Sequence, residues 1–154
     1  MRHLLREKRG LTLAEVVLAA AIISVAVLAI VGLFPTALQN VQYGGHMSQA
    51  SSLAQEMIEM IRTRQTGHFA DVPLYNNLDT RLPPPGGLPA PVLAHFTQWR
   101  NDIAPANPVG ALPQGWGTVT VGGPPDLLQV TVTVGWRESG NPTITIVTYV
   151  ARYG

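Results

Sequence analysis

The strongest pattern along the chain is an uninterrupted apolar run near its amino terminus. The nineteen residues from Val16 to Phe34 carry no charge, and one acid, Glu15, directly precedes them. At about 1.5 Å per residue, a helix of this length spans roughly 28 Å, close to the hydrocarbon thickness of a bilayer. We therefore predict a membrane-spanning helix over residues 11–34.

A second helical pattern follows and is amphipathic, so we predict that residues 35–66 continue the first helix. Glu59 and Arg62 are three residues apart beside its polar face, the spacing of an ion pair within one helix. Gly67 is predicted to end the helix. Apolar side chains recur at three- and four-residue steps on the opposite face, as expected of a helix that covers a sheet: Met47, Ala50, Leu53, Ala54, Met57, Ile58 and Ile61.

Three residues within this helical region weaken it. Pro35 removes one backbone hydrogen bond and is predicted to bend the helix where it leaves the apolar run. Gly44 and Gly45 each cost about 1 kcal/mol of helix stability relative to alanine. The glycine pair is compatible with a break or with a soft joint, and the sequence leaves both open.

The carboxyl-terminal third of the chain alternates between apolar and polar residues with a period of two. Residues 127–136 and 143–153 read as two strands, and the turn residues 137–142 between them predict an antiparallel hairpin. A shorter strand is expected over 117–122. With the long helix packed on one face of this sheet, the fold class is α+β, with a long helix and a small antiparallel sheet.

The middle of the chain is rich in proline and glycine, which predicts loops and turns. The segment 91–102 is the exception, and reads as a short helix or an irregular segment anchored by Phe96 and Trp99. The loop-forming clusters interrupt any longer period and lie at residues 82–91, 106–117 and 122–125.

Charge argues against direct nucleic-acid binding. The net charge is +1, but the first ten residues alone hold three arginines and the only lysine against one glutamate. The rest of the chain has six arginines and eight acids, a net charge of −2 with no basic cluster to hold phosphates. The chain has no cysteine, so no disulfide stabilises it.

The junction between the basic leader and the apolar run resembles a known processing signal. Arg9-Gly10-Leu11-Thr12-Leu13-Ala14-Glu15 is similar to the class III signal of type IV prepilins and pseudopilins. The resemblance covers residues 5–62, and the hairpin of 127–152 also looks like minor pilins and minor pseudopilins of the I/V type. Leu11 departs from the phenylalanine that is commonest in the family at that position.

The resemblance implies that a prepilin peptidase cuts between Gly10 and Leu11 and methylates the new amino terminus. Glu15 then becomes the fifth residue of the mature chain, and the family uses that acid to set the register of each subunit in a filament. Unpaired, a carboxylate at bilayer depth costs about 2.5–3.5 kcal/mol, so the new amine of a neighbouring helix is a natural partner. In the family, the segment near Pro35, Gly44 and Gly45 can melt during assembly.

The resemblance also implies a domain organisation and a set of partners. Residues 1–10 form the leader, 11–34 the transmembrane and filament-core helix, 35–66 the amphipathic helix, and 67–154 a β-rich head. The partners are the peptidase, other pilin or pseudopilin subunits, an inner-membrane assembly platform and membrane lipid. The amino terminus is expected in the cytoplasm and the head in the periplasm, in a filament that serves twitching motility, adhesion, natural competence or type II secretion.

No combination of residues points to catalysis, a cofactor or a metal site. The four histidines lack ligand-like spacing, no nucleophile has an orienting histidine and aspartate, and the glycine-rich pieces lack the lysine of a phosphate loop. Calcium would have only scattered acids: Asp71, Asp79 and Asp126. We therefore expect a structural subunit and no enzyme; the alternative is a periplasmic binding or enzymatic domain held by an uncleaved signal anchor.

Overall fold

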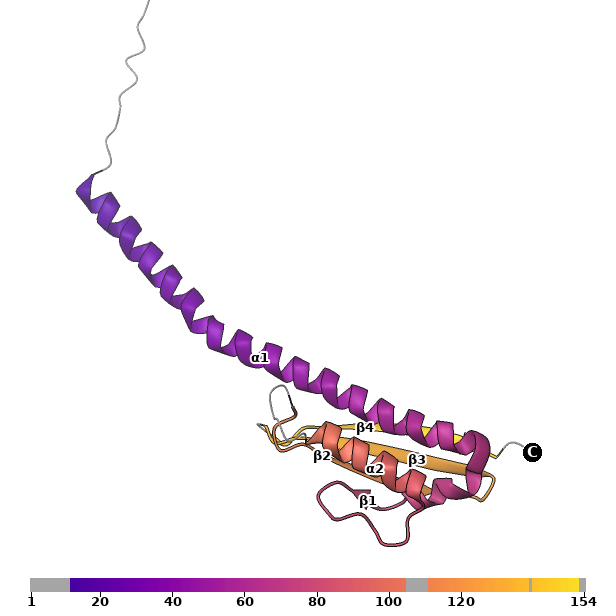
Figure 1. The fold of residues 1–154 in the computed structure, drawn as a ribbon. Coiled ribbons are helices and arrows are strands. Elements are labelled where there is room, and N and C mark those ends of the chain that lie inside the picture. The colour runs from indigo at the N-terminus through magenta and orange to yellow at the C-terminus, as the bar shows by residue number, and fades with distance from the viewer. Residues whose placement is uncertain (1–11, 105–110, 139, 153–154) are drawn as a thin grey trace, which may run out of the picture. The chain divides into compact units, whose positions relative to one another are not determined.

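The computed structural model describes residues 12–104, 111–138 and 140–152 (Figure 1). Its elements in chain order are a long helix α1 (Leu13–His68), a 3₁₀ helix η1 (Phe69–Tyr75), β1 (Leu78–Asp79), α2 (Ala90–Ile103), β2 (Trp116–Gly122), β3 (Leu127–Gly135) and β4 (Thr143–Ala151). The chain divides into two compact units between Tyr43 and Gly44.

The second unit is built on a four-stranded antiparallel sheet with the order β1-β2-β3-β4. The predicted hairpin is confirmed, with Leu127 opposite Ala151 and Gly135 opposite Thr143 at its two ends. Alternate residues of β3 form the core, since Val130, Val132 and Val134 are fully buried. The sheet and the long helix together confirm the predicted α+β class.

Two helices cover the buried face of the sheet. The carboxyl-terminal part of α1 contributes the apolar stripe from Ala50 to Ile61, and α2 contributes four buried residues, among them Phe96 and Trp99. The Trp99 indole N–H donates to the backbone carbonyl of Leu53 at 2.8 Å, so the two helices are joined directly in the core. The helical alternative for 91–102 is therefore the correct one.

The apolar stripe of α1 begins one turn later than the sequence predicts. Met47 is 37% exposed, whereas Ala50 is fully buried. The reason is that His46, one position earlier, turns toward the core: its ring lies edge-on to Trp136, with 6.5 Å between ring centroids. The side chains of neighbouring helical residues point about 100° apart. Because the His46 side chain points toward the core, the Met47 side chain points away from the sheet.

α1 ends at His68, one residue beyond the predicted end at Gly67, and η1 follows directly. Gly67 does not adopt the left-handed conformation that is typical of a glycine at a helix end. The chain reverses through η1, which buries Val72 and Tyr75 against the core. This segment leads into β1.

Glycine serves a steric purpose at two positions of the second unit. A side chain at Gly117 would collide with the Trp99 ring and lie 2.7 Å from Ile103 Cδ1, so the missing side chain lets α2 approach the sheet closely. In the turn between β2 and β3, Gly123 has φ +112° and a Cβ there would lie 2.7 Å from the Leu127 carbonyl. The predicted turn at 122–125 thus depends on this glycine.

Candidate functional site

The amino-terminal part of α1 displays apolar side chains on every side. All the large apolar residues from Leu13 to Phe34 are exposed, from 52% at Val27 to 85% at Leu13. Within the described residues, α1 is the only helix that is long and apolar enough to cross a membrane. A helix that is apolar all round needs lipid or other helices to cover it.

The first turn of α1 is closed by a reciprocal pair of hydrogen bonds between Thr12 and Glu15. The Thr12 backbone N–H and hydroxyl donate to Glu15 Oε2 at 2.8 and 2.9 Å. In return, the Glu15 backbone N–H donates to Thr12 Oγ1 at 3.3 Å. This is the capping box, in which two residues three apart satisfy each other's unpaired backbone donors.

The capping box gives Glu15 a local role beside the one that the resemblance implies. Threonine followed three residues later by glutamate, just before an apolar run, is a recognised start signal for a helix, and it is present at Thr12 and Glu15. The role predicted above for Glu15 rests on its charge alone, and the capping signal was not among the predictions. Gly10 and Leu11, the predicted cleavage site, lie outside the described residues.

Pro35, Gly44 and Gly45 all lie inside α1, and the helix continues through them without a break. A Cβ added at Gly44 or Gly45 would meet no other atom within 4 Å. Packing within the described chain therefore does not require glycine at these two positions. Their conformational freedom, or the close approach of another molecule, is the remaining reason for them.

Replacing both glycines by alanine is expected to stabilise this part of α1 by about 1 kcal/mol per residue, because alanine loses less backbone entropy. In the full chain in detergent, the amide hydrogens of residues 41–48 should exchange at least about tenfold more slowly, measured by mass spectrometry of exchanged peptides. Gly67→Ala, near the end of the same helix, is the control and should leave that segment unchanged. Unaltered exchange in the double variant would contradict a weak joint.

Two histidines of the second unit, His46 and His95, are engaged in separate contacts. His46 Nδ1 lies 3.3 Å from Glu138 Oε2, which also accepts the Trp136 indole N–H at 2.7 Å. The bond from Trp136 is the main reason that the pKa of Glu138 is lowered. In the other contact, His95 Nδ1 lies 2.6 Å from the Tyr75 hydroxyl.

Burial shifts both partners of the Tyr75–His95 contact toward their neutral forms. Desolvation raises the pKa of Tyr75 to about 12. It also lowers the pKa of His95, with a smaller contribution from the charge of Arg64. The neutral pair joins η1 to α2, so its evident role is a structural contact.

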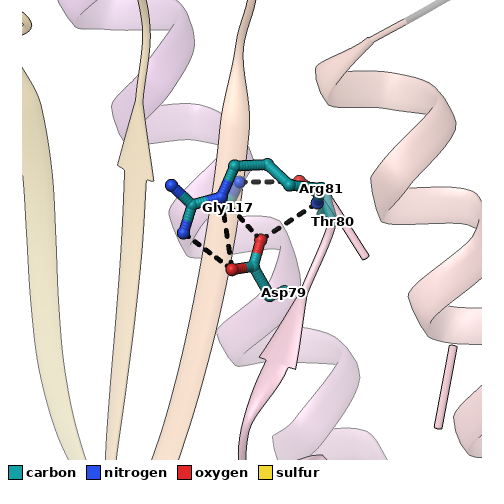
Figure 2. A network of polar contacts seen from close by, with 4 residues as sticks. All are labelled: Asp79, Thr80, Arg81 and Gly117. Atoms are coloured by element: carbon teal, nitrogen blue, oxygen red, sulfur yellow. Dashed lines mark hydrogen bonds and ion pairs between the residues drawn. The ribbon is translucent and has the colours of Figure 1, made fainter. Parts of the chain in front are cut away.

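Two of the three acids considered for calcium are paired with arginines. Asp71 accepts a hydrogen bond from Arg64 Nε at 2.7 Å. Figure 2 shows that Asp79 is held by Arg81, with Nε 2.9 Å from Oδ1 and the terminal nitrogen 2.7 Å from Oδ2. These bonds lower the pKa of Asp79. No group of three or more potential metal ligands occurs in the part of the chain that the structure describes.

The same network closes the β1 edge of the sheet. Thr80 is almost fully buried; its hydroxyl accepts the Gly117 N–H at 2.8 Å, and its N–H donates to the Gly117 carbonyl at 2.9 Å (Figure 2). The guanidinium of Arg81 lies over the Trp116 ring, 4.4 Å from its centroid. The cluster stabilises this edge of the sheet, since its charges and buried polar atoms satisfy one another.

Within the described residues, the candidate functional site is therefore the exposed apolar part of α1, together with Glu15, which takes part in the capping box at its start. Comparison with known proteins adds no family to this picture, because no family model, no curated protein and no solved structure matches the chain.

Proposed function

We propose that this chain is a prepilin-type subunit, a minor pilin or pseudopilin, that is anchored in the inner membrane and then packed into a filament through its amino-terminal helix. The observation that carries the proposal is the position of Glu15. It lies five residues beyond Gly10, in the first turn of a helix whose apolar side chains are exposed from Leu13 to Phe34. In a filament subunit, one such helix serves in two environments: it first lies in lipid and later packs among the helices of other subunits.

The capping box is compatible with a second partner for Glu15. Both bonds from Thr12 end on the Oε2 atom, and within the described residues no hydrogen bond reaches Oε1. A carboxylate can accept bonds on both oxygens, so the cap leaves room for the amine of a neighbouring subunit. Holding the carboxylate in the first turn also limits the positions in which that amine can meet it.

The proposal carries an orientation and a set of partners. The basic leader, with Arg2, Arg6, Lys8 and Arg9, would remain on the cytoplasmic side, and the second unit would lie in the periplasm. A prepilin peptidase would process the chain, and an assembly platform would transfer it into a filament with other subunits. Motility, adhesion, DNA uptake and secretion are the processes that such filaments support.

Mass spectrometry of the protein purified from membranes tests the proposal directly. With a prepilin peptidase present, the mature chain is expected to begin at Leu11 with a methylated amine. Gly10→Val should accumulate uncut, because a branched side chain beside the scissile bond obstructs the peptidase. An intact leader in the unaltered protein would contradict the proposal and favour an uncleaved anchor that holds a periplasmic domain.

A further inference from the structure

Within the described residues, the last strand of the sheet has one edge that no other strand covers, and the Gln65 side chain donates to the Ala151 carbonyl at its end. β4 forms hydrogen bonds with β3 on one side, and within the described residues no strand pairs with its other side. Its nine residues contain neither proline nor a charged side chain, and Val147 and Tyr149 are 47% and 63% exposed. Soluble proteins usually protect such an edge with charges, prolines, bulges or a very short strand, because free backbone groups attract another strand.

A groove follows this edge on the side of the helix. It has a volume of about 300 Å³ and lies between α1 and β4. Arg62 of α1 donates to the Thr148 hydroxyl at 2.9 Å and to Glu59 at 2.9 Å, so a cation and an acid stand together beside the strand. The walls of the groove are formed by Gln55, Ile58, Glu59 and Arg62 of α1 and by Ile146, Val147 and Thr148 of β4.

We propose that β4 pairs antiparallel with β4 of a second copy of this chain, about a two-fold axis at Val147. The sheets of the two copies would then form one continuous sheet of eight strands. In this register Thr145 lies opposite Tyr149 of the second copy. Each pair joins residues that face the same side of the sheet, so the buried faces of the two copies lie on the same side.

Two features favour pairing between the β4 strands of two copies over pairing of β4 with the β1 edge of a second copy. β1 has only two residues, and its last residue, Asp79, is paired with Arg81. Pairing of β4 with β1 of a second copy would therefore satisfy few backbone groups. A two-fold axis also reverses the order of Glu59 and Arg62 between the copies, so that the acid of each chain faces the cation of the other. The groove is therefore complementary to itself in charge.

This pairing uses no residue of the apolar run Val16–Phe34, and it does not depend on the proposed filament role. The test uses the full chain in detergent, with mass measured by sedimentation over a range of concentrations. The unaltered chain is expected to form dimers. Val147→Lys and Val147→Glu should each weaken dimerisation about tenfold or more, because like charges would meet at the axis.

An equal mixture of the lysine and glutamate variants should restore the dimer, since opposite charges then meet at the axis. Thr120→Lys, exposed on the same face but on the inner strand β2, is the matched control and should dimerise normally. Far-UV circular dichroism checks that each variant is folded. A monomeric unaltered chain, or dimers that persist equally in all variants, would overturn the proposal, the latter by pointing to association through the apolar helix.

The absence of cysteine allows a second, independent measurement. Opposed residues of antiparallel strands have Cα atoms about 4.5–5.5 Å apart, within the range that a disulfide can bridge. Val147→Cys should therefore form a disulfide-linked dimer under mild oxidation. Thr120→Cys should not, and equal cross-linking of the two variants would contradict a specific β4 contact.

Discussion

Replacing Glu15 by glutamine is expected to leave cleavage after Gly10 intact but to reduce entry into filaments about tenfold or more. Glutamine also serves in capping boxes, so the bonds with Thr12 can persist. What is lost is the negative charge that would pair with the amine of a neighbouring subunit at the edge of an apolar environment, where charge pairing is strong. The measurement is the ratio of this subunit in sheared filaments to that in membranes.

Thr12→Val separates the two roles of Glu15. It removes the hydroxyl that donates to Oε2 and accepts the Glu15 N–H, and should cost about 0.5–2 kcal/mol of helix stability at the amino terminus. The charge stays in place, so incorporation should remain close to normal. If Thr12→Val were excluded from filaments while Glu15→Gln entered them normally, Glu15 would be a helix cap and the proposed register would be wrong.

Replacing Trp99 by alanine is expected to destabilise the second unit by about 3–5 kcal/mol, the largest effect of any single substitution we propose there. Trp99 is fully buried, and its indole fills the space above Gly117 between α2 and the sheet. Its N–H also donates to the Leu53 carbonyl, so truncation would leave a cavity and remove a hydrogen bond between the two helices. Urea unfolding of the full chain, followed by the circular dichroism of the sheet, measures the loss.

Two further variants divide the Trp99 effect into its parts. Trp99→Phe keeps most of the apolar contact but loses the bond to Leu53, and should cost about 1–3 kcal/mol. Leu93→Ala, on the exposed side of the same helix, should change stability little. A loss below about 1 kcal/mol for Trp99→Ala would contradict the view that this residue joins α1, α2 and the sheet.

Several elements were predictable because their signals are local and repeated. The hairpin of β3 and β4 follows from nine-residue alternation on both strands, and the Glu59–Arg62 pair, 2.9 Å apart, follows from helical spacing. The capping box was also readable, since Thr12 and Glu15 match a short known signal. The same glutamate also carries a charge at the start of an apolar run, and the prediction for Glu15 used that charge alone.

Other features have no local signal. β1 has two residues, too few to show any period, and exists because Leu78 and Asp79 pair with β2. The 3₁₀ helix η1, which follows the end of α1 at His68, was not predicted and exists because Val72 and Tyr75 find buried positions there. In each case burial against residues distant in sequence outweighed a weak local preference.

Four features could be predicted from local patterns, because periodicity and charge are properties of neighbouring residues: the apolar run, the acid at its start, the amphipathic helix and the final hairpin. Three other features depend on packing and could not be predicted: His46 and not Met47 points toward the core, Trp99 lies over Gly117, and β4 lies at the edge of the sheet. The physical reason is that contacts across the sheet join residues far apart in the chain, and their geometry exists only once the whole unit has packed.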